Sequence, residues 1–217
     1  MINKAISKAK IGLMTHRNTM FLSTVCCSLE TQVTTDVPYA ATNGKVIKIN
    51  PDKFMELTEQ ERVFLLAHET LHVVYMHMTR RGDRDPRMFN AAADYVINGE
   101  LVQQGFTMIV GGLINPLYYG LATEQVYEVL KEENKCDEPN PLDGDVEEST
   151  GSPEDISELE NDVRDAISRA AQLADIRDEG ASVPKSVRRY LEELSKPKVN
   201  WRVVLRRFMQ SLDKSDY

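Results

Sequence analysis

Residues 58–78 read TEQERVFLLAHETLHVVYMHM, and this stretch decides the fold because it predicts a long helix that packs into the core. Thr58 and Glu61 fit a capping box, the pairing that opens many helices. Apolar residues then recur at helical spacing, at Val63, Phe64, Ala67, Leu71, Val74, Tyr75 and Met78. We therefore expect a continuous helix of about twenty residues with one apolar side.

Two histidines of this helix are spaced to bind one metal ion. His68 and His72 enclose Glu69 in an HExxH motif. Residues four apart lie about 40° apart around a helix and about 6 Å apart along it, so both imidazoles can reach one ion. Zn2+ suits these ligands, and Glu69 would stand beside a water on the metal as a general base. Two core histidines are the alternative, but they would leave the Glu69 carboxylate buried without a reason.

A catalytic zinc ion usually has three protein ligands, so a third is required. His77 lies nine residues after His68 and five after His72. On a continuous helix His77 would point away from the metal, which favours a supporting or surface role for it. We therefore expect the third ligand on the next helix.

That next helix begins at Asp85-Pro86, an N-cap followed by a first-turn proline, and its pattern runs from Arg87 to Gln104. If it returns antiparallel past the metal, Asp94 becomes the third ligand. An ion pair between Asp94 and a nearby arginine is the alternative.

Other polar residues of the same helix extend this prediction. Asn90 and Asn98 share a stripe with Asp94, and either could hold its carboxylate by a hydrogen bond. Glu100 is the reserve carboxylate ligand.

The stretch from Ala67 to Asn98 reads AHETLHVVYMHMTRRGDRDPRMFNAAADYVIN. It closely resembles the Putative metallopeptidase domain that bacterial and phage proteins carry in front of a von Willebrand factor A-like domain. The resemblance extends to shorter motifs at Ala41-Thr42-Asn43-Gly44, Asn50-Pro51, Ala122-Thr123-Glu124-Gln125-Val126-Tyr127, Val199-Asn200-Trp201-Arg202 and Leu205-Arg206-Arg207-Phe208. It covers nearly the whole chain except the acidic middle. One departure is Asn43, where the family tends to have Asp.

The resemblance implies a zincin-like fold, which is α+β and mainly helical. We expect a small antiparallel sheet or hairpin, an HExxH active helix and an antiparallel ligand helix. Asn43-Gly44 is a strong hairpin signal between residues 37–42 and 45–50, and the second run leads directly into the active helix. By resemblance, one strand forms the rim of the cleft and pairs with extended substrate. Its residues are Val46, Ile47, Lys48 and Ile49.

The chain is expected to contain a core at 1–135, an acidic flexible loop at 136–153, and C-terminal helices at 154–217 that pack on the core. Thirteen acidic residues and two lysines lie between Lys131 and Asp162. The loop lacks periodicity and is rich in Pro, Gly, Asp, Glu and Ser, which favours a solvated spacer. A pseudosubstrate or a calcium-binding loop is the alternative.

Further helices are predicted at 2–17, 124–133, 155–178, 185–195 and 200–212, while 21–34 favours a strand over a helix. No metal-adhesion motif of a von Willebrand factor A-like domain is present. We therefore expect the chain to be a fragment, or a shortened relative, of a longer protein.

The composition fits a cytoplasmic protein that acts on neither nucleic acid nor membranes. The net charge is −8 and no basic face is clustered, which argues against a nucleic-acid partner. No apolar run reaches the length of a membrane span, and the N-terminus has no signal-peptide pattern.

Two functions fit these features. The first is a zinc-dependent metallopeptidase that cleaves a protein or peptide, with His68, His72 and Asp94 holding Zn2+ and Glu69 acting as general base. Tyr118 and Tyr119 are candidates for stabilising the oxyanion. The second is a zincin-like scaffold without peptidase activity, which works with a von Willebrand factor A-like domain or an AAA+ ATPase. The intact Glu69 favours the first.

Overall fold

The computed structural model describes residues 1–133, 140–147, 151–178, 180–184, 187–188 and 192. Contacts divide the chain into two units, Met1–Val183 and Pro184–Tyr217, and the account below concerns the first. The helices predicted at 185–195 and 200–212 fall almost wholly outside the described residues.

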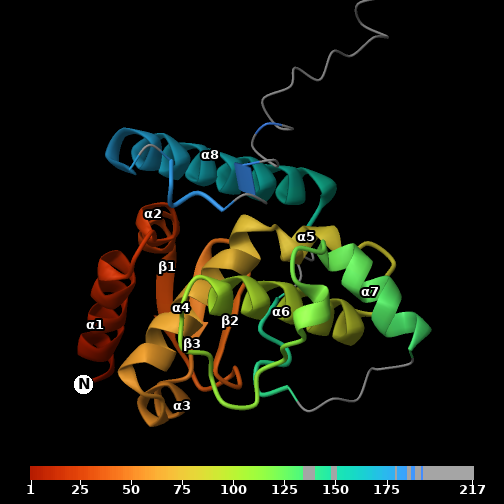
Figure 1. Cartoon of the computed structure of the whole chain (residues 1–217), viewed down its shortest axis with the longest axis horizontal. Coiled ribbons are helices and arrows are strands. Elements are labelled where there is room, and N and C mark those ends of the chain that lie inside the picture. Colours follow the sequence, from red (N-terminus) through yellow and green to blue (C-terminus); the bar gives the residue numbers. More distant parts are fainter. Residues whose placement is uncertain (134–139, 148–150, 179, 185–186, 189–191, 193–217) are drawn as a thin grey trace, which may run out of the picture. The chain divides into compact units, whose positions relative to one another are not determined.

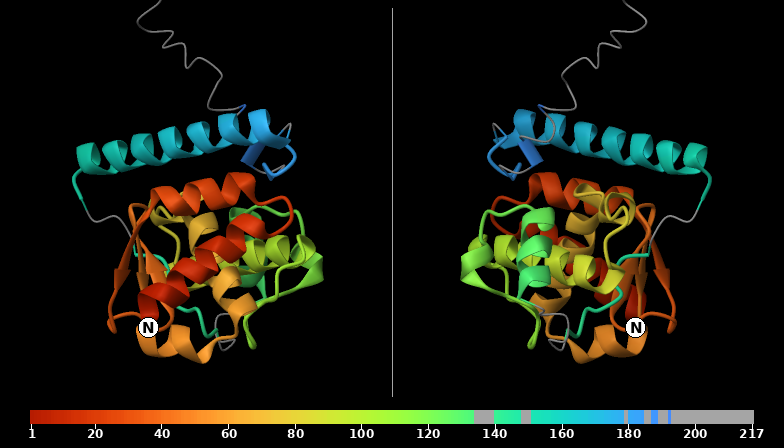
Figure 2. Two further views of the ribbon diagram at one scale, coloured as in Figure 1. Left: turned by 90° about the vertical axis from the view of Figure 1, so that its left-hand side faces the viewer. Right: turned by 90° about the vertical axis from the view of Figure 1, so that its right-hand side faces the viewer.

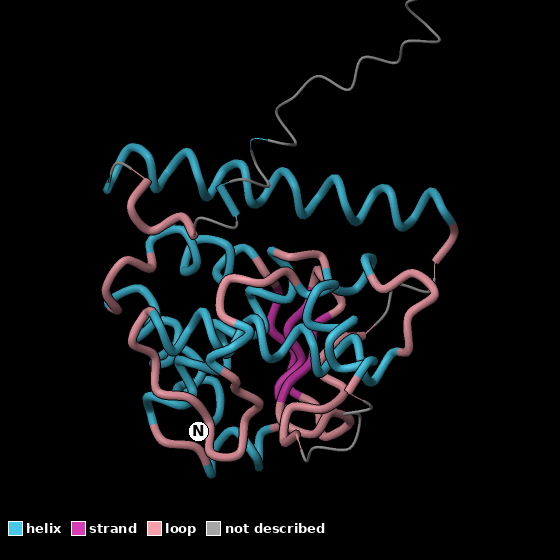
Figure 3. Tube along the Cα trace, turned by 45° about the vertical axis from the view of Figure 1, so that its right-hand side comes forward, coloured by secondary structure: helices cyan, strands magenta, loops and turns pink. Residues whose placement is uncertain are grey.

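The first unit is mainly helical with one small sheet, as predicted. Its elements in chain order are α1 (Ile2–Thr15), α2 (Met20–Ser28), β1 (Glu30–Val33), β2 (Ala40–Thr42), β3 (Val46–Ile49), α3 (Pro51–Glu56), α4 (Glu59–Val74), α5 (His77–Arg80), α6 (Pro86–Gln103), the 3-10 helix η1 (Pro116–Tyr118), α7 (Thr123–Glu132) and α8 (Pro153–Asp178). The strands form a small part of the fold, and most of the described chain is helical (Figure 3). None of the helices within the described residues is both long and apolar enough to cross a membrane.

The sheet has the strand order β1-β3-β2, with β3 in the middle. The predicted hairpin is confirmed, because β2 and β3 are antiparallel. Asn43 closes the turn itself: its Oδ1 accepts hydrogen bonds from the backbone N–H groups of Lys45 and Val46, each at 3.0 Å. Gly44 follows with a φ of 94°, which favours glycine.

Three predictions about this region were wrong. Residues 21–34 do not form one strand, because helix α2 precedes the short β1; Phe21, Leu22 and Val25 are buried at helical spacing. The sheet is therefore mixed rather than antiparallel, since β1 runs parallel to β3. The short helix α3 also separates β3 from α4, because Asn50 and Pro51 start a helix of their own.

The central position of β3 also overturns the predicted substrate strand. Val46, Ile47, Lys48 and Ile49 pair with β1 on one side, and Ile47, Lys48 and Ile49 also pair with β2 on the other. Both edges of this strand are occupied, so it cannot add an extended peptide.

Helix α4 is the core of the first unit and contacts α1, α2, α6 and β2 (Figure 1). Every residue from Phe64 to Val74 is buried. Helix α8 lies along α2 (Figure 2). The predicted capping box is present: Thr58 Oγ1 accepts from the Glu61 N–H at 3.3 Å, and the Glu61 carboxylate accepts from the Thr58 N–H at 2.9 Å.

Helix α4 is shorter than predicted. It ends at Val74, and Met76 takes a left-handed conformation with a φ of 54°, after which α5 begins at His77. A non-glycine residue in this conformation costs about 1–2 kcal/mol, so surrounding contacts must hold it there. The buried Met76 side chain provides such contacts. The helix is interrupted at Tyr75 and Met76, and the His77 imidazole contacts His72 of α4.

We expect Thr58→Ala to lower the free energy of unfolding by about 1 kcal/mol, because the Glu61 N–H loses its partner at the start of α4. Thr58→Ser, which keeps the accepting oxygen, should stay within a few tenths of a kcal/mol of the parent protein. Urea unfolding followed by circular dichroism measures both. Equal stability of the alanine and serine variants would contradict the role of the cap.

Candidate metal centre

Four buried side chains from three parts of the fold meet at one point. His68 and His72 come from α4, Asp94 from α6, and Asp145 from the segment 140–147. One ligand atom from each lies within 4.8 Å of the others, and all four residues are fully buried. The structure thus brings together the three predicted ligands and adds a fourth residue.

The donor distances suit a small tetrahedral cation. His68 Nε2 lies 2.8 Å from Asp145 Oδ2 and 3.6 Å from Asp94 Oδ1. His72 Nε2 lies 3.3 Å from Asp94 Oδ1, 3.5 Å from Asp145 Oδ2 and 2.9 Å from His68 Nε2. Ligands around a tetrahedral ion with bonds of about 2.1 Å lie about 3.4 Å apart. The observed distances between these donor atoms range from 2.8 to 3.6 Å and so include that value.

The orientation of His68 is set by Asn98. The Asn98 side-chain N–H donates to the Leu113 carbonyl at 2.9 Å, so its Oδ1 faces His68 Nδ1, also at 2.9 Å. His68 Nδ1 must therefore carry the proton and donate, which leaves the lone pair on Nε2 for a metal. Asn98 was predicted to support Asp94, but it supports His68 instead.

His72 is oriented by His77 in the same way. Their Nδ1 atoms lie 3.1 Å apart, and His77 Nε2 lies 3.0 Å from Thr123 Oγ1. If His72 Nε2 binds a metal, His72 Nδ1–H donates to His77 and His77 Nε2–H donates to Thr123. Burial, together with the charges of His72 and Arg80, holds the pKa of His77 well below its usual range, as a neutral acceptor requires. The supporting role considered for His77 thus fits, although the continuous helix assumed for it was wrong.

Asp94 is held by a residue that the sequence did not suggest. The Asn140 side chain donates to Asp94 Oδ2. Asn90, predicted for this task, is buried, and its amide makes no hydrogen bond within the described residues. The reserve ligand Glu100 instead accepts a hydrogen bond from the Tyr75 hydroxyl.

Glu69 lies fully buried beside this cluster, and neither of its carboxylate oxygens makes a hydrogen bond within the described residues. Burial and the charge of Asp145 raise the pKa of Glu69 well above its usual range, although His72 opposes them. Among the described residues, one oxygen of Asp94 and one of Asp145 are also buried without a hydrogen-bond partner. Buried carboxylate oxygens of this kind are costly unless a cation or a proton compensates them.

The pKa values within the cluster show how strongly it attracts positive charge. Burial lowers the pKa of His72, but Asp145 and Asp94 outweigh burial and raise it to about 10. Burial and the neighbouring Asp145 raise the pKa of Asp94 to about 6. Burial also raises the pKa of Asp145, but His72 and His68 outweigh it and hold the pKa below its usual range. A divalent cation would satisfy these carboxylates together.

Asp145 is the member of the cluster that sequence reasoning missed. It lies in the stretch interpreted as a solvated spacer, yet Leu142 and Asp145 are both buried. The composition gave no means of choosing among the carboxylates of this stretch. Of the interpretations offered for this stretch, the pseudosubstrate loop was the one in which the segment would bind at the active site.

The candidate oxyanion residues have apolar packing partners. Tyr118 is buried and packs edge-on against Tyr95, with ring centroids 5.1 Å apart. The Tyr119 ring lies against Gly99, where an added Cβ would come within 2.9 Å of it.

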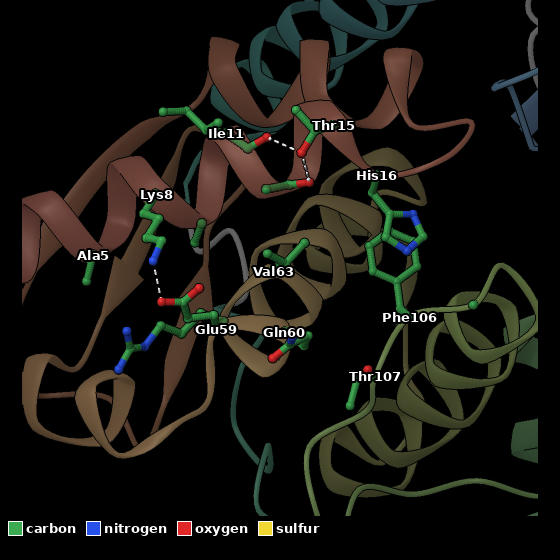
Figure 4. A pocket seen from close by; sticks show the side chains of 14 residues that line it. Ala5, Lys8, Ile11, Thr15, His16, Glu59, Gln60, Val63, Phe106 and Thr107 are labelled. Atoms are coloured by element: carbon green, nitrogen blue, oxygen red, sulfur yellow. Dashed lines mark hydrogen bonds and ion pairs between the residues drawn. The ribbon is translucent and has the colours of Figure 1, made fainter.

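A pocket of about 460 Å³ lies elsewhere in the first unit, between α1, the start of α4 and residues 105–107 (Figure 4). His16 stacks on Phe106 at one end, and Lys8 pairs with Glu59 at the other. Its lining includes none of the metal-site residues, so it is separate from the candidate centre.

One of the comparisons with known proteins, the match to a family model, agrees with a metal site. Neither the curated proteins nor the solved structures provide a match to the chain. The family model described as "Putative metallopeptidase domain" matches residues 3–217, which is almost the entire chain. The chain therefore belongs to the family that carries this description.

Proposed function

We propose that the protein is a zinc-dependent peptidase, with His68, His72 and Asp94 as metal ligands and Glu69 as general base. The observation that carries this proposal is the orientation of the two histidines. Each Nδ1 has a partner of its own, in Asn98 and His77, while both Nε2 atoms converge on Asp94. Imidazoles arranged in this way are ready to bind a metal.

Zinc is the metal that best suits the donors. Neutral imidazole nitrogens with one carboxylate oxygen form a three-ligand set that leaves a coordination position for water. Calcium and magnesium favour sites built from oxygen ligands. When bound, zinc supplies a Lewis acid that lowers the pKa of water and polarises a carbonyl group.

Glu69 is suited to accept a proton in this site. It follows His68 directly, and its carboxylate is not engaged by any hydrogen bond within the described residues. Burial raises its pKa, and a cation bound by the neighbouring ligands would act in the opposite direction. A base with a pKa near the working pH is the most effective. Glu69 would take a proton from the attacking water and deliver it to the leaving amine of a peptide substrate.

A second function is favoured by the burial of the centre. His68, His72, Asp94 and Glu69 are all fully buried, so a substrate cannot reach them in this conformation. The same arrangement would suit a zincin-like scaffold that works with a von Willebrand factor A-like domain or an AAA+ ATPase. The experiments below separate the two functions.

We expect the protein to bind one zinc ion, and His68→Ala, His72→Ala and Asp94→Ala each to weaken binding by several orders of magnitude, because each removes one of three ligands. His16→Ala, which changes a histidine outside the centre, should keep the zinc. Elemental analysis after dialysis against a mild chelator measures occupancy. Full occupancy in the Asp94 variant would show that the ligand set is wrong.

We expect Glu69→Gln to retain zinc and the fold but to lower the rate of peptide cleavage by roughly two to four orders of magnitude, the usual contribution of a general base. The measurement is cleavage of a broad peptide library, with zinc content and circular dichroism as controls. Equal rates in both proteins would rule out the general-base mechanism. A zinc-loaded parent protein that cleaves nothing would instead favour the scaffold function.

We expect His77→Leu to weaken zinc binding by about 10–100-fold without abolishing it, because His72 loses the group that fixes its orientation. Thr123→Val, one step further along the same chain of hydrogen bonds, should have a smaller effect. Competition with a chromophoric chelator gives both affinities. If His77→Leu binds no zinc while Asp94→Ala binds normally, His77 is itself a ligand.

A further inference from the structure

Asp145 gives the cluster one more ligand than a catalytic metal needs. Its Oδ2 lies 2.8 Å from His68 Nε2 and 3.5 Å from His72 Nε2, the same two atoms that face Asp94. Four protein ligands close a tetrahedral site, whereas catalytic zinc sites keep one position open for water or substrate. Asp145 therefore occupies the position at which the reaction would take place.

We propose that Asp145 is a displaceable fourth metal ligand and that residues 140–147 are an internal plug, which a peptide substrate must replace. This inference rests on the proposed metal site of His68, His72 and Asp94. It adds a latent state, in which the Asp145 carboxylate of the chain itself fills the open coordination position.

The backbone of the plug is bound as an added strand would be. The Thr42 N–H donates to the Asp145 carbonyl at 2.8 Å, and the Glu147 N–H donates to the Thr42 carbonyl at 2.9 Å. Thr42 and Val146 thereby form a parallel bridge at the outer edge of β2. β2 is the edge strand next to β3 and contacts α4. Extended peptides bind exposed sheet edges through the same kind of backbone hydrogen bonds.

Side chains hold the plug with contacts that are individually modest. Glu147 pairs with Lys48 at 2.7 Å and Asp143 with Arg87 at 3.3 Å, and all four side chains keep solvent exposure between 27% and 72%. Ion pairs this exposed contribute about 0–1 kcal/mol each. Leu142 adds one buried apolar contact, and Asn140 donates to Asp94. The metal bond of Asp145 would thus be a main attachment of the plug, which a competing metal ligand can replace.

The test uses the full chain loaded with cobalt(II), whose visible absorption reports ligand exchange without requiring any peptidase activity. Acetohydroxamate, a small chelating ligand, is titrated into the parent protein, Asp145→Ala and the control variant Glu56→Ala. In the parent protein it must displace the Asp145 carboxylate, and this competition weakens its apparent affinity. We expect Asp145→Ala to bind acetohydroxamate at least tenfold more tightly than the parent protein. Glu56→Ala, which removes an exposed carboxylate on α3 outside the plug, should match the parent protein.

A second variant keeps Asp145 and loosens the plug. Glu147→Lys places two positive charges together at Lys48, and we expect an affinity for acetohydroxamate between those of the parent protein and Asp145→Ala. If Asp145→Ala does not fold, the acetohydroxamate affinity of Glu147→Lys tests the proposal instead.

Two results would overturn the inference. The first would leave the three-ligand metal site intact, and the second would revise its ligand set. Unchanged acetohydroxamate affinity in both Asp145→Ala and Glu147→Lys would show that Asp145 does not occupy the exchangeable position. A folded Asp145→Ala that binds no cobalt would show that Asp145 is an obligatory ligand. Failure of the parent protein to bind cobalt would overturn the proposed metal site and the plug together.

Discussion

The burial of three carboxylates beside two histidines is the constraint on which this structure depends. Glu69, Asp94 and Asp145 are fully buried, and some of their oxygens make no hydrogen bond within the described residues. Such a group is stable only where positive charge reaches it. Protonation of His72, whose pKa is raised to about 10, supplies part of this charge. A divalent cation supplies it more completely, because one ion can contact two imidazoles and two carboxylates together.

The surrounding fold holds the two histidines rigidly. Helix α4 is buried from Phe64 to Val74, so its side chains have fixed surroundings. The left-handed turn at Met76 ends that helix and places His77 against His72, while Asn98 on α6 orients His68. Each imidazole is thus fixed by an element other than its own helix, which is how a metal site gains its geometry before the metal binds.

Local patterns in the sequence predicted the elements that depend on local interactions. The capping box at Thr58, the Asn43-Gly44 hairpin and the start of α6 at Asp85-Pro86 all form as expected, because backbone and side-chain hydrogen bonds within a few residues determine them. The end of α4 was missed because the apolar spacing continues through Met78 while the backbone does not. Asp145 was missed because a contact 77 residues from His68 leaves no periodic signal in an acidic stretch. Asn140 was missed for the same reason.

The bridge between Thr42 and Val146 fixes the register of the acidic stretch against β2, which its composition does not reveal. Successive side chains of an extended segment point to opposite faces, so the pairing with β2 fixes which carboxylate turns inward. Moving the segment by a single residue would direct Gly144 or Val146 toward the histidines in place of Asp145. Residues 141–144 form the turn that leads into this pairing. The backbone hydrogen bonds of Thr42, and not the charge of the acidic stretch, therefore determine which of its carboxylates reaches the histidines.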